Sequence, residues 1–158
     1  MNKQINILIL PDIRSAENVG AIFRTADAVG IDKIYLVGIT PAPVDRFGRA
    51  RQDLAKSALG AEKSVPWEQR ENLKELILEL KKESYKIIAI EQSENSLDYK
   101  EVKIGEKNAF ILGTETTGLP KEILDMCDII AEIPMKGEKE SLNVSVAFGV
   151  AIFRILNI

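Results

Sequence analysis

The chain has 158 residues, of which 46% are hydrophobic and 28% are charged. This composition is typical of a globular protein, and the length suits one domain, so we expect a single domain over residues 1–158. The 21 basic and 24 acidic side chains leave a net charge of −3, which disfavours nonspecific binding of a polyanion over the whole surface.

Histidine is absent and cysteine occurs once, as Cys127. Ser-His-Asp catalysis, Cys-His catalysis and histidine-ligated zinc are therefore excluded, and we expect no bound metal. Without a histidine to activate it, Cys127 is expected to be a small buried side chain rather than a nucleophile. No signal peptide or membrane span is recognisable, so a cytoplasmic protein in a reducing compartment is expected.

Apolar runs alternate with helical repeats along the chain. An apolar run predicts a strand at residues 5–10, followed by a helix at residues 17–29 that ends before Gly30. Further strands are predicted at residues 33–37, 86–90, 108–112 and 129–133, and helices at residues 52–58, 71–83 and 121–126. This alternation predicts an α/β domain with a largely parallel sheet, covered by helices on both faces.

The final helix, expected within residues 141–158, is apolar on all sides. Its side chains form two faces, Leu142, Val146, Val150 and Phe153 on one and Val144, Phe148, Ile152 and Ile155 on the other. A helix that is apolar all round needs cover all round. One face should pack on the sheet and the other on a second copy of the chain, so that a charge at Phe148 or Ile152 would disrupt a homodimer. Burial of both faces within one chain is the alternative.

The loop GTETTGLP, residues 113–120, follows a predicted strand and precedes a predicted helix, where nucleotide-binding loops lie. It is not a phosphate loop, because Leu119 and Pro120 stand where lysine and a hydroxyl residue are needed. Glu115 would also repel phosphates, so the loop suits a cationic or hydroxyl-bearing ligand. A plain surface turn is the alternative for this loop taken alone.

The first predicted helix carries two polar residues of interest. Asn18 lies in its first turn, and Arg24 follows about 9 Å along the axis and roughly 120° around it. Taken singly, Asn18 is explained as a group that satisfies free N–H groups and Arg24 as a solvated cation. Their joint occurrence with the 113–120 loop favours a functional site.

Three separated segments together resemble the SpoU/TrmH family of S-adenosylmethionine-dependent RNA 2′-O-ribose methyltransferases, which belongs to the knotted SPOUT class. They are residues 18–24, ILGTETTGLP at 111–120, and IPMKGEKESLNVSVA at 133–147. The resemblance extends from end to end of the chain, with the order and spacing of the segments intact. It implies a single-domain parallel-sheet SPOUT fold with a C-terminal trefoil knot, which no periodicity can indicate.

The resemblance also implies a cofactor and a set of site residues. S-adenosylmethionine is expected in a pocket of the C-terminal loops, near Leu112, Gly113, Gly118, Ile133, Met135 and Leu142. The implied catalytic group is Arg24, Asn18, Glu115, Ser141 and Asn143. We interpret Arg24 as a cation that binds a phosphate and stabilises the developing alkoxide, since arginine is effectively always protonated. Asn18 would orient Arg24 or the ribose, and Glu115 would anchor Arg24 or Asn18.

Ser141 and Asn143 are the polar residues before the final apolar helix. The resemblance implies that both reach the cofactor and the reacting ribose. Helix capping is the alternative explanation, in which Ser141 as the N-cap accepts a hydrogen bond from the backbone N–H of Asn143 or Val144, and the two roles can coexist. Ser145 is assigned to packing.

A local basic segment predicts contact with RNA despite the acidic total. The expected RNA-binding residues are Arg14, Arg46, Arg49, Arg51 and Lys56, with only Asp53 opposing those in the segment at residues 46–56. Phe47 either stacks on a base or anchors the loop. A solvated charged loop is the alternative.

The sequence therefore predicts a metal-free RNA 2′-O-ribose methyltransferase that acts on tRNA or ribosomal RNA as a homodimer. One alternative is a catalytically silent RNA-binding dimer with the same fold, which the intact polar site residues disfavour. Another is a cofactor-binding α/β protein that acts on a small molecule, which the basic segment disfavours.

Overall fold

One sheet of seven strands forms the centre of the computed structural model, which describes residues 3–158. In spatial order the strands are β3 (Trp67–Arg70), β2 (Lys33–Val37), β1 (Ile5–Pro11), β6 (Lys107–Leu112), β4 (Lys86–Ile90), β7 (Ile129–Glu132) and β5 (Leu97–Asp98). Every pairing between these strands is parallel. The predicted α/β class is confirmed, whereas the two edge strands, β3 and β5, were not predicted.

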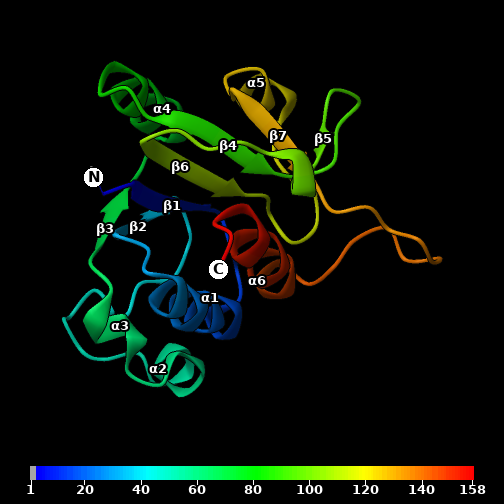
Figure 1. Ribbon diagram of the computed structural model, residues 1–158. Coiled ribbons are helices and arrows are strands. Elements are labelled where there is room, and N and C mark those ends of the chain that lie inside the picture. Colours follow the sequence, from blue (N-terminus) through cyan, green and yellow to red (C-terminus); the bar gives the residue numbers. More distant parts are fainter. Residues whose placement is uncertain (1–2) are drawn as a thin grey trace.

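Helices cover both faces of the sheet (Figure 1). One face packs with α1 (Ala16–Val29), α2 (Gln52–Ala58), α3 (Ala61–Ser64), α6 (Val144–Ile155) and the short 3-10 helix η1 (Tyr99–Glu101). The other packs with α4 (Leu73–Lys82) and α5 (Lys121–Leu124). Because successive strand residues point to opposite faces, Leu8 and Leu10 join the first core, while Ile7 and Ile9 join the second.

Helix α1 is fixed at its start by a side-chain cap. The Oγ of Ser15 accepts a hydrogen bond from the backbone N–H of Asn18 at 3.1 Å. The helix ends at Gly30, which has a positive φ of 75° that glycine adopts without strain. Asn18 is therefore held in the first turn, next to the carboxyl end of β1.

Helix α6 begins at Val144, and Asn143 rather than Ser141 is its N-cap. The Oδ1 of Asn143 accepts hydrogen bonds from the backbone N–H groups of Ser145 (2.9 Å) and Val146 (3.4 Å). Ser141 lies outside the helix in the segment that precedes it. The predicted cap at Ser141 is therefore wrong, because Asn143 is the residue whose side chain reaches the free N–H groups of the first turn.

One apolar face of α6 is buried and the other is exposed. Phe148 and Ile152 are fully buried at 0% exposure and belong to the core shared with α1. The other face remains open, with exposures of 49% for Val146, 40% for Val150 and 40% for Phe153, while Leu142, which precedes the helix, is 37% exposed. The prediction that Phe148 and Ile152 face a second copy is wrong, because these two side chains complete the core of their own chain. Burial of both faces within the chain is excluded as well.

The segment between β7 and α6 projects from the body before the chain returns to pack α6 beside α1 (Figure 1). The trefoil knot implied by the resemblance stays a prediction. Within residues 3–158, the helices are all too short or too polar to cross a membrane.

We expect Phe148→Ala to lower the free energy of unfolding by about 3–5 kcal/mol, because it leaves a cavity in a closely packed core. Urea denaturation followed by circular dichroism measures this change. Val146→Ala, on the open face of the same helix, is the matched control and should cost much less in a dilute sample. Equal losses in the two variants would contradict the assignment of the buried face.

Candidate functional site

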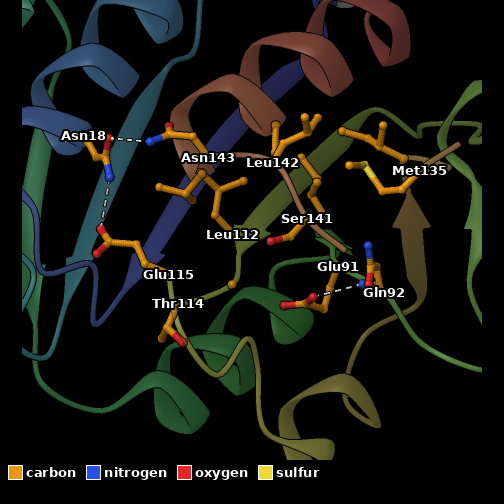
Figure 2. Close-up of a pocket in the computed structure, with 15 residues that line it drawn as sticks. Asn18, Glu91, Gln92, Leu112, Thr114, Glu115, Met135, Ser141, Leu142 and Asn143 are labelled. Atoms are coloured by element: carbon orange, nitrogen blue, oxygen red, sulfur yellow. Dashed lines mark hydrogen bonds between the residues drawn. The ribbon is translucent and has the colours of Figure 1, made fainter. Parts of the chain in front are cut away.

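A cavity of about 390 Å³ opens at the carboxyl edge of the sheet, beside the ends of β4 and β6 (Figure 2). Loops that follow the carboxyl ends of parallel strands commonly form ligand sites. The apolar part of the wall is formed by Ile90, Leu112, Ile133, Met135, Leu142, Val144 and Ala147. The polar part is formed by Asn18, Glu91, Gln92, Gly113, Thr114, Glu115, Ser141 and Asn143.

Three distant segments meet through hydrogen bonds at one end of the cavity (Figure 2). The Nδ2 of Asn18 donates to the Oε1 of Glu115 at 3.3 Å, and the Nδ2 of Asn143 donates to the Oδ1 of Asn18 at 3.2 Å. The backbone N–H of Ser15 also donates to Glu115, at 3.3 Å. The Asn18 amide is therefore held from both ends, which fixes its orientation.

Asn143 takes part in both the site and the helix. While its Nδ2 donates to Asn18, its Oδ1 caps α6 and also accepts a hydrogen bond from the Oγ of Ser145 at 2.6 Å. Ser145 was assigned to packing alone, but its hydroxyl helps to orient the capping side chain. The position of Asn143 thus depends on the formation of α6.

A second carboxylate, Glu91, lies beneath the 113–120 loop. Its Oε2 accepts a hydrogen bond from the backbone N–H of Leu119 at 3.2 Å, and its Oε1 accepts one from Gln92 at 3.0 Å. A Cβ at Gly113 would lie 2.1 Å from this Oε2, and a Cβ at Gly118 would lie 2.6 Å from it. Gly118 also has a positive φ of 69°. Both glycines are therefore needed for the loop to close over the carboxylate.

The structure brings together most of the predicted site. Four of the predicted catalytic residues line the cavity, namely Asn18, Glu115, Ser141 and Asn143. Five of the predicted cofactor residues line it too, namely Leu112, Gly113, Ile133, Met135 and Leu142. Gly118 lies behind the wall, against Glu91, and acts through the shape of the loop.

Arg24 is the predicted catalytic residue that lies apart from the cavity of its own chain. It is an exposed residue of α1 and is not part of the cavity wall. Its offset of roughly 120° from Asn18 around the helix explains the separation. Of the two partners considered for Glu115, the structure shows Asn18.

The predicted RNA-binding residues lie on the surface, but some of them are paired. Arg49 forms an ion pair with Asp45 at 2.9 Å, and Arg51 forms one with Asp53 at 2.8 Å. The expectation that only Asp53 opposes the basic segment is therefore wrong, because Asp45 folds back onto it. Arg14, Arg46 and Lys56 are exposed, and within residues 3–158 they form no ion pair.

Sequence reasoning missed Glu91, Gln92 and Thr114, which all line the cavity. Thr114 belongs to a loop that was recognised, whereas Glu91 and Gln92 follow β4. They reach the site because β4 pairs with β6, so that Ile90 lies opposite Leu112. Only the strand order could have placed Glu91 and Gln92 in the cavity wall. The apolar pattern of the sequence does not reveal that order.

Cys127 is not part of the cavity wall. It is partly buried, and burial raises the pKa of its thiol to about 11. At neutral pH the thiol is therefore protonated and a poor nucleophile, as expected from the lack of histidine. The described residues contain no group of three or more His, Cys, Asp or Glu side chains placed to hold a metal ion.

These features define an α/β domain with a small-molecule cavity at the carboxyl edge of a parallel sheet. The cavity wall contains two glutamates and no lysine or arginine, so it suits a neutral or cationic ligand. Residues 6–153 match the sequence profile of the SpoU rRNA Methylase family, and the chain belongs to that family.

Known relatives agree with this assignment. The chain is 34% identical over 154 residues to a Staphylococcus saprophyticus protein named as a TrmH family tRNA/rRNA methyltransferase, covering 98% of this chain and 59% of the relative. It is also similar to the AdoMet-bound rRNA methyltransferase structure from Sinorhizobium meliloti, with a TM-score of 0.88, 26% identity, and coverage of 98% and 57% of the two chains. The chain thus spans less than two thirds of the length of these proteins.

A second similar structure has nearly the length of this chain. It is described as giving insight into the 2-OH methylation of C/U34 on tRNA. The TM-score is 0.81 at 25% identity, and the match covers 98% of this chain and 95% of the other. The SPOUT fold predicted from the three segments is confirmed by these matches.

We expect Glu91→Ala to loosen the 113–120 loop, because it leaves the backbone N–H of Leu119 without its acceptor. A partly buried donor without a partner costs about 1–3 kcal/mol, so the Leu119 amide should exchange roughly 5- to 150-fold faster. Amide hydrogen exchange followed by NMR measures this rate. Glu94→Ala, a carboxylate three positions further on that is exposed, is the matched control. Unchanged protection of Leu119 in Glu91→Ala would show that the carboxylate does not hold the loop.

Proposed function

We propose that this chain is an S-adenosylmethionine-dependent RNA 2′-O-ribose methyltransferase that acts on tRNA or ribosomal RNA. The observation that carries the proposal is the hydrogen-bonded group Glu115, Asn18 and Asn143 at the mouth of a cavity that contains two carboxylates and no basic side chain. A nucleoside triphosphate would be repelled there, whereas a sulfonium cation would be attracted. Membership of the SpoU family supports the same ligand.

The cavity suits an adenosine with a positively charged substituent. Leu112, Ile133, Met135 and Leu142 offer apolar surface to the flat base, and the backbone of the surrounding loops offers donors and acceptors. At Gly113 the missing side chain lets the Glu91 carboxylate approach the backbone of the cavity wall. The AdoMet-bound structure of the Sinorhizobium meliloti enzyme supports this assignment of the cofactor.

The cofactor would supply a methyl group on a sulfonium, so that a C–O bond to the ribose would form as the C–S bond breaks and the demethylated cofactor leaves. The hydroxyl proton would pass to an oxygen of the adjoining phosphate. Asn18 and Asn143 are held in fixed orientations and would position the ribose rather than move the proton. Ser141 would contact the ribose or the cofactor from the same wall. Arg24 would bind the adjoining phosphate and stabilise the developing alkoxide.

A homodimer would place further groups at this site. Leu142 lines the cavity and is exposed two residues before α6 begins, so the start of α6 and of its open apolar face lies near the rim of the cavity. The side chain of Thr25 meets α6 at Gly149, which places Arg24 next to the junction of α1 and α6. A second copy that covers the open face would lie beside both the rim and Arg24. We therefore include a homodimer through α6 in the proposed function.

The function is tested by tritium transfer from labelled S-adenosylmethionine to unmodified tRNA and ribosomal RNA, followed by digestion and identification of 2′-O-methyl nucleosides. Arg24→Ala should reduce turnover by about 10²–10³-fold and Arg24→Lys should restore little of it, while the cofactor binds as before. Lys63→Ala, which removes an exposed cation on α3, is the matched control. Cofactor and RNA binding without any methyl transfer by the wild type would favour the silent RNA-binding dimer.

The cofactor assignment is tested separately by thermal unfolding. S-adenosylmethionine at 100 times its Kd should stabilise the native state by about 2.7 kcal/mol, whereas ATP should not stabilise it at all. Stabilisation by ATP alone would contradict the charge argument for the cavity.

We expect Phe153→Glu to convert a dimer to a monomer, because it places a charge in the centre of the proposed apolar interface. Sedimentation velocity at micromolar concentration measures the change. Leu78→Glu is the matched control, since Leu78 is 52% exposed on α4 at the opposite face of the sheet. A wild-type chain that sediments as a monomer would remove the dimer from the proposal.

A further inference from the structure

The loop between β2 and α2 forms a compact turn around Asp45. The Oδ1 of Asp45 accepts hydrogen bonds from the backbone N–H groups of Phe47 (2.8 Å) and Arg49 (3.0 Å), and its Oδ2 accepts one from the Nε of Arg49 (2.9 Å). Two backbone hydrogen bonds close the turn. The N–H of Asp45 donates to the carbonyl of Arg49, and the N–H of Gly48 donates to the carbonyl of Asp45. These bonds, led by the one from the Arg49 backbone, hold the pKa of Asp45 below its ordinary value, so the carboxylate stays ionised at neutral pH.

This turn presents an exposed aromatic ring with two cations beside it. Phe47 is 67% exposed, which leaves most of an apolar side chain in contact with solvent. The guanidinium carbons of Arg46 and Arg49 lie 4.8 Å and 5.1 Å from the centre of its ring. Because Asp45 fixes Arg49, the ring and the guanidinium planes form one preorganised platform.

A shallow groove of about 530 Å³ adjoins the platform. Its lining combines apolar side chains, including Ile39 and Val44, with the polar groups of Arg51 and Gln69. A flat ring that carries hydrogen-bonding groups at its edge fits this combination, whereas a fully apolar ligand would leave the polar groups unpaired.

The platform is attached to the loop that carries the candidate active site. The hydroxyl of Thr40 accepts a hydrogen bond from the backbone N–H of Ile13 at 3.0 Å and donates one to the carbonyl of Leu10 at 2.7 Å. The backbone N–H of Ile39 donates to Asp12 at 3.1 Å. The start of the platform loop is therefore fixed to residues 10–13, which lead directly to Arg14 and Asn18. Since β2 adjoins β1 and β1 adjoins β6, the start of this loop, just after Val37, lies roughly 10 Å from the end of β6.

We propose that Phe47, Arg46 and Arg49 form a stacking site for one unpaired nucleotide of the substrate RNA, next to the nucleotide that is methylated. This inference rests on the proposed function, because it assumes that RNA reaches the cavity. Arg46 is exposed and without an ion pair among the described residues, so it is free to bind the phosphate of the stacked nucleotide. A base within a duplex is already stacked on both faces and cannot use the platform, so the site selects single-stranded segments or loops.

The test uses a fluorescein-labelled uridine 12-mer, a ribose-phosphate 12-mer without bases, and a 12-base-pair RNA duplex. Phe47→Ala should weaken binding of the uridine 12-mer on the order of tenfold, and it should not change binding of the abasic chain or of the duplex. Phe47→Trp should retain or improve the affinity for the uridine 12-mer. Leu78→Ala removes another exposed apolar side chain, on α4, and should have no effect. Anisotropy titrations measure all of these affinities.

Each result supports or overturns the stacking site. Equal losses on the uridine and abasic chains would show that Phe47 acts only through phosphate contacts and would overturn it. Absence of wild-type binding to the uridine 12-mer, or wild-type affinity in Phe47→Ala, would overturn it as well. The proposed function is tested independently by methyl transfer. If Phe47→Ala binds the uridine 12-mer as the wild type does and still transfers methyl groups, the stacking site is overturned and the methyltransferase activity is not.

Discussion

The pairing of β1 with β6 is the constraint on which the candidate site depends. It places Ile5 beside Lys107 and Ile9 beside Ile111, so that segments from the two halves of the chain end at the same edge of the sheet. The loop after β1 then enters α1, and the loop after β6 contains Glu115. Asn18 joins these loops through Glu115 and joins both to α6 through Asn143. If the pairing shifted by one residue, every side chain of β1 would change faces and these contacts would be lost.

The cavity carries negative charge and part of the exposed surface carries positive charge, which suits a cationic cofactor and an RNA. The cavity has two carboxylates and no cation, whereas the exposed surface has Arg14, Arg46 and Lys56 without ion pairs among the described residues. A small cation and a polyanion can therefore bind to one molecule at different places. The net charge of −3 does not reveal this division, because it sums all charges regardless of their positions. Total charge is a poor guide to RNA binding where the cations are local.

The sequence predicted the central elements better than the edges of the molecule. Buried parallel strands are continuous apolar runs, so β1, β4 and β6 were recognisable, whereas β3 reads Trp-Glu-Gln-Arg and β5 has two residues. Four of the polar cavity residues, namely Asn18, Glu115, Ser141 and Asn143, were predicted from a resemblance, since nothing local brings Asn18 near Glu115. The faces of α6 were separated correctly by periodicity, but their roles were exchanged. Periodicity shows that two faces exist, while only the packing of α1 and the sheet decides which one is buried.

Asn143 shows why a residue at such a junction is chemically restricted. Its oxygen accepts from the first turn of α6 while its nitrogen donates to Asn18, so it needs an acceptor and a donor on one short side chain. Aspartate has the cap acceptors but no donor, and serine has a suitable oxygen but a shorter reach. Asparagine satisfies both demands, which couples the start of the helix to the orientation of Asn18. The site is therefore assembled by the same hydrogen bonds that begin α6, and a change that frays this helix end would also release the amide that faces the cavity.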